Sequence, residues 1–572
     1  MSYYEIPQSV IKDDFEFLKS SWKALKSGKL SKEEFKTIRV PFGIYEQREP
    51  ETYMVRLKTH AGSISPQQLL ELAKMAKTYA NGSIHVTTRG GLQLHYVSFE
   101  NLIEVTQKLH KLGLSGRGGG GNTVRNIVSD FYSGIAKDSV FDVAPYANAV
   151  TSKMLGLKDS FNLPRKFKIA FSSSNADRSF ATITDVGFIA TKKGRKKGFI
   201  VYIAGGMGSK SRLGHKIIDF LPDNEVFLFS QATKQVFDTH GNRENKHSAR
   251  LRFLADKIGI EALVDLIKAE VESLRKKGGW EISVGEKKPL EAIEDNKKEL
   301  KFSKEEKLWW KRFVRPQKQK GYYYAKIPLT LGDIPYKSME KLAKSLMPFK
   351  DSICFTNNQN LILKNLDAKT LLALYPLILE FSPQSKRATI FGDMVACTGA
   401  ATCQLGIARP RGAVSALEKY LLTKDIDLDI LQDFRIHLSG CPNSCGNHFT
   451  ANLGFFGRIL RNSGNPYPGY NVVVGAIIGE GKTRFATKVA SIAAFHLPEF
   501  VYQVLTKYIS LKGEFKEFED WIDNGGADEI AAIASNYEKV PSFEECPKAY
   551  YDWSSDELFK ESLKKNGIGE EN

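Results

Sequence analysis

The chain has 572 residues, of which 42% are hydrophobic and 11% aromatic, and its formal net charge at pH 7 is +17. One hydrophobic core rarely serves a chain of this length, so we expect about two to four domains. No run of about 18 apolar residues is present, which excludes a membrane-spanning helix. Charged residues rather than an apolar stretch follow the N-terminus, so we expect no secretory signal and predict a cytoplasmic protein.

Basic residues outnumber acidic ones by 82 to 65. Such a surplus favours an acidic partner or an anionic substrate. Nucleic acid is a common partner of basic chains, but the basic residues are scattered here. One dense run, residues 192–197, lies between two apolar segments and is typical of a solvated hairpin tip. We therefore predict a protein that binds neither nucleic acid nor a membrane.

The first half of the chain opens with a charged helical arm, residues 1–45. Residues 46–118 then alternate between the periodicities of strands and helices. We predict strands at 53–57, 84–87 and 92–96, with helices at 66–79 and 102–112, in the order βαββα. Residues 119–284 follow as a further domain.

The same order of elements returns in the second half. A segment rich in Lys and Glu, residues 285–320, is expected to be an exposed connection with some helix, anchored by Trp309 and Trp310. Residues 321–386 repeat the βαββα order, with strands at 322–329, 352–355 and 361–363 and helices at 337–346 and 368–379. Residues 387–512 are predicted to form the last domain, and residues 513–572 a mostly polar tail.

Four stretches of the two halves match one another. Residues 87–92 correspond to 356–361 at an offset of 269, and residues 203–208 correspond to 474–479 at 271. Residues 168–172 and 186–188 correspond to 435–439 and 453–455, both at 267. Matches in the same order at a nearly constant offset indicate a tandem duplication. We therefore predict an α/β (α+β) protein with pseudo-two-fold symmetry and a site shared between its halves.

Four of the six cysteines fall within 49 residues: Cys397, Cys403, Cys441 and Cys445. In a reducing compartment, clustered thiols are interpreted first as metal ligands. Four thiolates can hold either a structural zinc or a cubane iron–sulfur cluster. The gap between Cys397 and Cys403 is wider than zinc sites usually show, which favours iron–sulfur, with zinc or unliganded thiols as the alternatives. Gly and Pro in residues 440–446 permit a tight loop whose N–H groups point at the sulfurs.

This cysteine pattern, Cys-x5-Cys followed by Gly-Cys-Pro-Asn-x-Cys-Gly, closely resembles the sirohaem/[4Fe–4S] motif of the nitrite and sulfite reductase family. That family is also built as a tandem duplication, and the resemblance covers about residues 40–510. It implies two ferredoxin-like half-domains and two α/β domains that bind sirohaem and a [4Fe–4S] cluster. It further implies that all four cysteines hold the cluster and that Cys445 also bridges to the sirohaem iron.

Three stretches of the first half resemble the family's anion-binding segments: residues 87–95, 121–126 and 163–168. Arg presents planar charged forks and Lys compact ammonium groups, and both suit an oxyanion that needs charge and protons. The resemblance therefore places four bases on the distal side of the sirohaem, namely Arg89, Arg125, Lys166 and Lys168. It also suggests sirohaem contacts from Gln93, Arg117 and Asn122. The glycine turn at residues 205–208 resembles one that lies near the cofactor, and we interpret three histidines as hydrogen-bonded scaffold: His85, His95 and His437.

The first hypothesis for function is six-electron reduction of sulfite to sulfide. Nitrite reductases that the chain resembles tend to carry Asn at the position of Lys168, after Trp, whereas Phe167 and Lys168 are the sulfite-like choice. Ferredoxin-type reduction of nitrite to ammonia is the alternative, and a non-catalytic homologue is the third hypothesis. No flavin or nucleotide module is recognised in the sequence, so we expect electrons from an acidic ferredoxin or a flavoprotein subunit.

Overall fold

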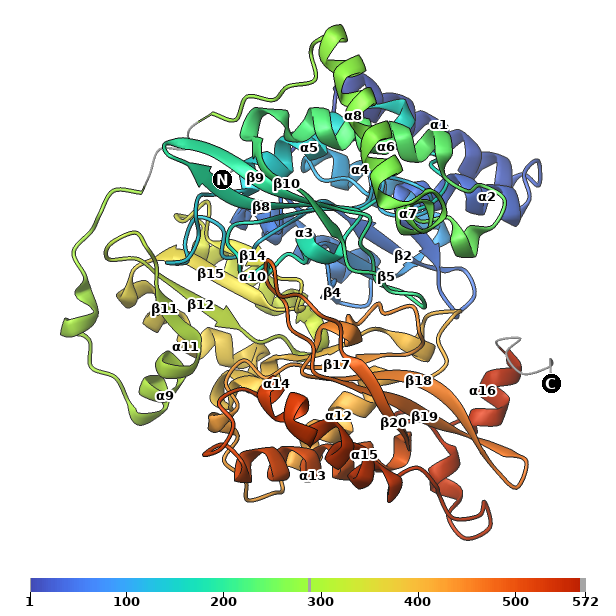
Figure 1. Cartoon of the computed structure of the whole chain (residues 1–572), viewed down its shortest axis with the longest axis vertical. Coiled ribbons are helices and arrows are strands. Elements are labelled where there is room, and N and C mark those ends of the chain that lie inside the picture. The colour runs from blue at the N-terminus through green and yellow to red at the C-terminus, as the bar shows by residue number, and fades with distance from the viewer. Residues whose placement is uncertain (1, 286–289, 566–572) are drawn as a thin grey trace.

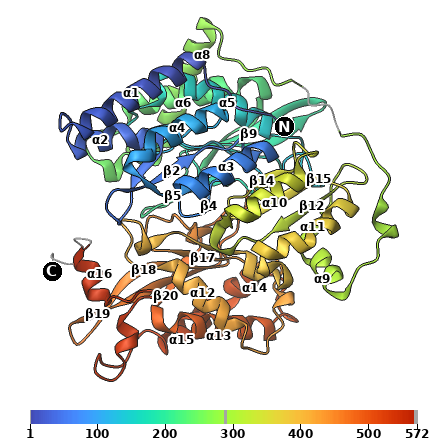
Figure 2. The same ribbon diagram turned by 180° about the vertical axis from the view of Figure 1, so that it is seen from behind.

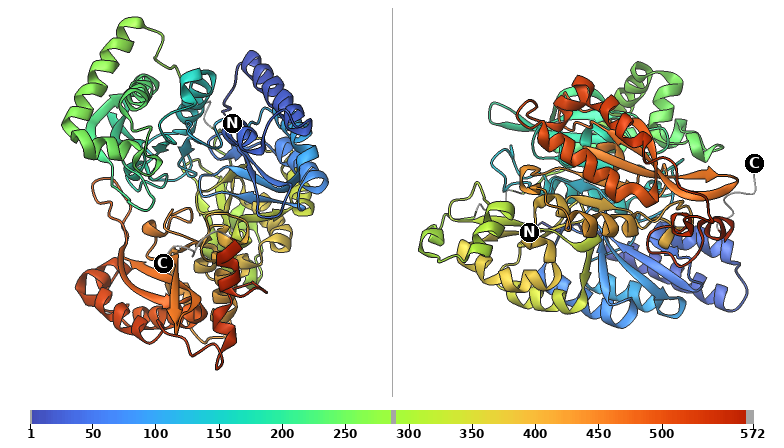
Figure 3. Two further views of the ribbon diagram at one scale, coloured as in Figure 1. Left: turned by 90° about the vertical axis from the view of Figure 1, so that its right-hand side faces the viewer. Right: turned by 90° about the horizontal axis from the view of Figure 1, so that it is seen from below.

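The computed structural model describes residues 2–285 and 290–565 of the chain. As predicted, the architecture mixes helices and sheets, and the described residues form four five-stranded sheets (Figure 1). Two sheets belong to the βαββα segments and two to the α/β domains. Figure 3 shows the two α/β domains one above the other, with the pair of half-domains beside both of them. No described helix is long and apolar enough to cross a membrane.

The two half-domains exchange short strands. The first sheet has the order β1 (Ile44–Glu46), β2 (Thr52–Leu57), β5 (Leu92–Ser98), β4 (Ser83–Val86) and β13 (Asp333–Pro335). The second sheet has the order β11 (Val314–Pro316), β12 (Tyr323–Ile327), β15 (Leu361–Leu366), β14 (Ile353–Phe355) and β3 (Ser63–Ile64). Each half-domain therefore donates one edge strand to the sheet of the other, which ties the halves of the chain together.

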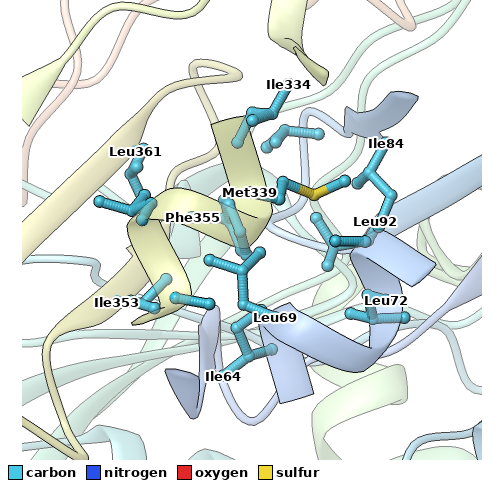
Figure 4. Close-up of a cluster of buried hydrophobic side chains, with 14 of the residues drawn as sticks. Ile64, Leu69, Leu72, Ile84, Leu92, Ile334, Met339, Ile353, Phe355 and Leu361 are labelled. Carbon is cyan, nitrogen blue, oxygen red and sulfur yellow. The ribbon is translucent and has the colours of Figure 1, made fainter. Parts of the chain in front are cut away.

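The helices of the half-domains share one core with these sheets. Helix α3 (Pro66–Tyr79) begins where predicted, because Ser65 and Gln68 form a capping box and Pro66 takes the first helical position. Its apolar face meets α10 (Tyr336–Leu346), while α4 (Leu102–Lys111) and α11 (Ala368–Phe381) complete the layer (Figure 2). Figure 4 shows Leu69 and Leu72 of the first half packed with Met339 of the second. The half-domains therefore form one packed unit.

The two α/β domains have the same sheet topology. The first sheet has the order β10 (His215–Pro222), β9 (Lys196–Ile203), β8 (Val186–Lys193), β7 (Ile169–Ser172) and β6 (Val128–Ser129). The second has the order β16 (Met394–Ala396), β17 (Ile436–Ser439), β18 (Leu453–Asn462), β19 (Asn465–Val474) and β20 (Thr487–Ala493). In both sheets, the first three strands along the chain are parallel to one another. The fourth strand is antiparallel to the third, and the fifth is antiparallel to the fourth. The predicted duplication is thus confirmed, with β7 equivalent to β17 and β8 to β18.

Helices cover the two α/β sheets. In the first domain they are α5 (Ala144–Gly156), α6 (Val226–His240), α7 (Leu251–Ile258) and α8 (Ile260–Lys277), and in the second α12 (Pro410–Leu421) and α13 (Leu497–Ser510). The basic run at 192–197 is the predicted hairpin tip, because Lys192 pairs with Lys197 across the β8–β9 turn.

The terminal and connecting segments pack onto these domains. Helices α1 (Gln8–Lys26) and α2 (Lys32–Arg39) lie on the first half-domain, and α9 (Lys304–Phe313) buries Trp309 and Trp310 as anchors, as expected. The predicted polar tail contains α14 (Phe518–Trp521), α15 (Ala527–Ser535) and α16 (Phe559–Lys565). Its Phe518, Trp521 and Ile530 are buried in the core of the second α/β domain, so much of the tail is a structural part of that domain.

Candidate active site

The four clustered cysteines lie in loops at one edge of the second α/β sheet. Cys397 directly follows β16, and Cys441 comes two residues after β17. Because β16 and β17 are parallel neighbours, the loops at their carboxyl ends lie side by side, and Cys397 N donates to Leu438 O at 3.2 Å. Cys403 follows a short 3-10 turn, Gly399–Ala401, and Cys445 follows in the second loop. The topology thus brings both cysteine pairs to the same edge.

Glycines let these loops approach closely. A Cβ atom on Gly440 would lie 2.7 Å from Ala408 O, and one on Gly446 would lie 2.2 Å from Leu438 O. Neither position can hold a side chain without moving backbone. Gly440 N donates to Cys397 Sγ at 3.2 Å, which is the N–H contact to sulfur expected from the sequence. The loops therefore form a cradle that suits thiolates bound to a metal cluster.

The thiols influence one another electrostatically. Burial and the neighbouring charge of Cys445 raise the pKa of Cys397. Burial is also the main cause that raises the pKa of Cys403 and Cys441, and Cys445 adds to it in both. Four thiolates gathered here need a positively charged group between them. Within residues 2–285 and 290–565, no three His, Cys, Asp or Glu side chains are placed to hold a single metal ion. A cubane holds four thiolates around a group of irons, whose positive charge would meet this need.

Basic residues predicted from the first half gather in a second group. Arg89 lies in the β4–β5 turn, and its Nη2 donates to Asn126 O at 2.6 Å, while Arg125 donates from Nη1 to Gly119 O. The buried Nε atoms of Arg89 and Arg125 have no hydrogen-bond partner among the described residues. Burial and the charge of Arg125 lower the pKa of Arg89 to about 9. Buried guanidinium nitrogens without a hydrogen-bond partner are typical of a site that binds an anion.

Lys166 and Lys168 precede β7 and belong to the same group. Burial, followed by the charges of Arg250 and Arg125, lowers the pKa of Lys166 to about 7. Burial lowers the pKa of Lys168 well below its ordinary value, and the charge of Arg89 lowers it further. Both lysines keep some accessible surface, as residues that line a ligand site do. The negative charge of Cys445 has the opposite effect and raises the pKa of Lys166. The cysteine loop is therefore close enough to the basic group for their charges to interact.

Thr88 joins the two groups directly. Its Oγ1 donates to Cys445 O at 3.0 Å, and the next residue along the chain is Arg89. The repeat contains an equivalent contact, in which Asn357 Nδ2 donates to Arg178 O at 2.7 Å. Arg178 therefore occupies the position of Cys445 in the other half, and it forms ion pairs with Asp130 and Asp138. At the position that the pseudo-two-fold symmetry relates to Cys445, the first half of the chain therefore has an arginine held by ion pairs instead of a cysteine.

The basic group also contains four bases that the sequence analysis did not single out: Arg56, Lys58, Arg250 and Arg252. Arg250 forms two hydrogen bonds with the buried Asp185, at 3.2 and 2.7 Å. Arg252 has buried Nε and Nη1 atoms without a partner among the described residues. A Cβ on Gly206 would lie 2.7 Å from Arg252 Nη1, so the glycine turn of residues 205–208 lies against these arginines. No local sequence pattern identifies Arg250 and Arg252, which lie at the start of α7.

The remaining predicted contacts divide into two sets. Gln93 is buried on β5, and with its amide oxygen turned toward Arg56 it accepts from that guanidinium at 2.7 and 3.0 Å. Asn122 Oδ1 accepts from Arg165 at 3.4 Å, beside the basic group. Arg117 is not brought into the group, because its guanidinium pairs with Asp14 of α1, donates to Leu155 O and stacks on Phe161.

The predicted scaffold histidines are all hydrogen-bonded. His85 Nδ1 lies 2.8 Å from Asp333 Oδ1, His95 Nε2 lies 3.1 Å from the Gln93 amide, and His437 Nδ1 lies 3.1 Å from Asn447 O. Burial lowers the pKa of both His95 and His437 to about 3. These two histidines are therefore neutral near pH 7.

The chemistry of the site defines a class of protein. Four thiols in a glycine-lined cradle fit an iron–sulfur cluster, and guanidinium nitrogens without a partner in the basic group fit an anionic substrate or a cofactor with several carboxylates. This combination is that of a redox protein that reduces an anion.

Comparisons with known proteins give the family. The chain matches the nitrite and sulphite reductase 4Fe-4S domain over residues 120–274 and 391–542, and the nitrite/sulfite reductase ferredoxin-like half domain over residues 45–112. The protein belongs to the nitrite and sulfite reductase family, whose cofactors are sirohaem and a [4Fe–4S] cluster.

Individual relatives support this assignment along most of the chain. Ferredoxin–nitrite reductase of Synechococcus elongatus is 29% identical, over 80% of this chain and 86% of its own. The assimilatory ferredoxin-dependent nitrite reductase of Haloferax mediterranei is 24% identical, over 90% of each chain. The solved structure of the Mycobacterium tuberculosis NirA protein shares the fold, with a TM-score of 0.75 and 21% identity over 90% of this chain and 97% of its own.

Proposed function

We propose that the protein reduces a small nitrogen or sulfur oxyanion by six electrons, and that the reaction takes place between the cysteine loops and the basic group. One observation carries this proposal. Thr88 contacts the backbone of Cys445 and is followed by Arg89, so a single turn connects the loop of the cluster ligands with the anion-binding bases. When bound, sirohaem and the [4Fe–4S] cluster supply electrons one at a time at a metal that can hold the substrate.

Within this proposal, Cys397, Cys403, Cys441 and Cys445 would hold the cluster, and Cys445 would be its ligand on the side of the sirohaem. Arg89, Arg125, Lys166 and Lys168 bind the oxygens of the anion. The unpaired Arg252, together with Arg56, Gln93 and Asn122, is placed to bind carboxylates of the sirohaem. Arg89, Arg125 and Arg252 each have a buried guanidinium nitrogen without a partner among the described residues, which supports their roles.

Lys166 is the residue best placed to supply protons. Each oxygen that leaves the substrate must leave as water, so the site needs a donor as well as positive charge. Burial and the neighbouring arginines lower the pKa of Lys166 to about 7, and an ammonium with that pKa can both lose and regain a proton near neutral pH. Lys168 and the arginines then hold the oxyanion in place while the proton moves.

The comparisons favour nitrite as the anion over the sulfite that the sequence analysis preferred. The relatives in Synechococcus elongatus and Haloferax mediterranei are named nitrite reductases. One observation favours sulfite as the second candidate. Lys168 adds an ammonium group beside Arg89 and Lys166, and sulfite has more charge and more oxygens to compensate than nitrite.

A ferredoxin is the electron donor that we propose. The relatives just named use ferredoxin according to their names, and the net charge of +17 suits an acidic protein. A separate flavoprotein subunit is the other donor consistent with that charge. For the protein's location we propose the cytoplasm, where both donors occur.

Metal analysis and turnover of both anions test the proposal. We expect about one sirohaem and one four-iron cluster per chain, which together contain about five irons, and reduction of nitrite, sulfite or both by a reduced dye. The ratio of the two kcat/KM values then ranks the anions. Stoichiometric zinc without iron, or a fully loaded protein that reduces neither anion, would overturn the proposal.

A further inference from the structure

Arg48 reaches across a domain boundary to the cysteine loops. It lies between β1 and β2 of the first half-domain, and none of the motifs in the sequence pointed to it. Its Nε donates to Cys403 O at 3.1 Å, and its Nη2 donates to Gly406 O at 3.4 Å. The guanidinium therefore spans both ends of the turn that begins at Cys403.

This turn is tightly constrained on its inner side. Cys403 N donates to Gly399 O at 2.9 Å, and Gly406 N donates to Cys403 O at 3.2 Å. A Cβ on Gly406 would lie 2.4 Å from Ala400 N, so the turn packs directly against backbone. Its outer side faces solvent, since Leu405 is 68% exposed. Arg48 is the side chain that contacts the turn carbonyls from this open side.

The base of Arg48 is itself held in place. The neighbouring Gln47 is buried. Its side-chain Oε1 accepts from Tyr96 N at 2.7 Å, and its backbone N–H donates to Thr52 O at 2.9 Å. These bonds fix the β1–β2 turn before the guanidinium makes its contacts. A preorganised side chain loses less conformational freedom when it binds, so its two bonds can hold the cysteine turn effectively.

The charge of Arg48 acts on the nearest thiolate. The guanidinium donates to the backbone carbonyl of Cys403, so the positive charge of Arg48 lies beside this ligand. A positive charge beside a cluster thiolate favours the reduced cluster, which carries one more negative charge than the oxidised cluster. Thr88 contacts the other cysteine loop at Cys445 O, so the first half-domain contacts both loops.

We infer that Arg48 is a positioning residue for the [4Fe–4S] cluster, which holds the turn of Cys403 in place and raises the reduction potential of the cluster. The two effects have different requirements. Holding the turn needs a planar fork that reaches two carbonyls, whereas raising the potential needs only a nearby positive charge. The inference rests on the family's cluster and does not depend on which anion is reduced.

Two substitutions in the holoenzyme separate these effects. Arg48→Gln removes the charge and the fork, so we expect a lower midpoint potential, by an amount equal to about a tenfold change in the one-electron equilibrium, or about 59 mV. We also expect about tenfold faster release of iron to a ferrous chelator. Arg48→Lys keeps the charge but cannot span both carbonyls, so its potential should stay near that of the wild type while iron release is faster.

Arg409→Gln is the matched control. Arg409 carries a charge close to Arg48, but its guanidinium donates to Ser554 O at 2.7 Å. Potentials followed by electron paramagnetic resonance, together with iron release, do not require turnover, so they remain informative if neither anion is reduced. A wild-type potential and iron-release rate in Arg48→Gln, or equal effects in Arg409→Gln, would overturn the inference. If Arg48→Gln does not take up a cluster, wild-type iron release in Arg48→Lys would also overturn it.

Discussion

Replacing Lys168 by Asn tests the assignment of the anion site with one side chain. The backbone should tolerate the change, because Lys168 N donates to Asp185 Oδ2 at 2.9 Å and Lys168 O accepts from Val186 N at 3.1 Å. Neither bond involves the ammonium group. Asn is shorter than Lys and keeps a polar head, so the variant differs mainly in lacking an amine, beside Arg89 and Lys166, that a bound anion would favour in its charged form.

The size of the effect follows from the surroundings of Lys168. A hydrogen bond to a charged group contributes about 1.5–3 kcal/mol, and each 1.36 kcal/mol in the barrier is tenfold in rate. We therefore expect kcat/KM for sulfite to fall by about tenfold to over a hundredfold. Nitrite has fewer oxygens and less charge, so its kcat/KM should fall much less or rise.

The assay measures both anions on the wild type and the variant with the same reduced dye, after sirohaem and iron contents have been matched. Lys168→Arg is the control, because it keeps the charge and should retain most of the sulfite activity. An equal fall for both anions in Lys168→Asn would show that Lys168 is a general electrostatic residue. The structural reason for considering sulfite would then be lost.

Two further predictions concern the bridge and the fold. Cys445→Ser should abolish turnover and the magnetic coupling between haem and cluster, because an alcohol is a poor bridge between irons; normal activity would show that the bridging role was misassigned. Burial lowers the pKa of His60 to about 4, so the folded state binds fewer protons than the unfolded chain between about pH 6.5 and pH 4 and loses stability as the pH falls. From pH 7 to pH 5, urea titration should show the free energy of unfolding falling by about 2 kcal/mol more in the wild type than in His60→Gln; equal losses would refute a neutral His60.

Much of the candidate site follows from local sequence. The Cys-x5-Cys spacing and the glycines around Cys441 and Cys445 are short-range patterns, and so is the alternation of Lys166 and Lys168. Each reports a geometry that a few neighbouring residues define. The duplication was also readable from the sequence alone, because constant offsets need no knowledge of the fold.

Secondary structure was predictable where local signals agreed. Helix α3 runs from Pro66 to Tyr79 as predicted, because a capping box and a proline define its first turn. Strands β3 and β13 were not predicted. Each has only two or three residues, and each exists because it pairs with a sheet of the other half of the chain. Such pairing depends on partners hundreds of residues away, which no local pattern contains.

The sequence alone therefore predicted the family and the duplication, which are confirmed, and it supplied the proposed cluster ligands and four of the proposed anion-binding bases. Only the tertiary structure decided which other charges join them. Arg250, Arg252 and Lys58 resemble ordinary surface bases in the sequence until packing removes water from around them. Arg117, which the motif suggested as a cofactor contact, is instead paired with Asp14 by the packing of α1. The electrostatics of a buried site depend on burial and on distant neighbours, and both are properties of the folded chain.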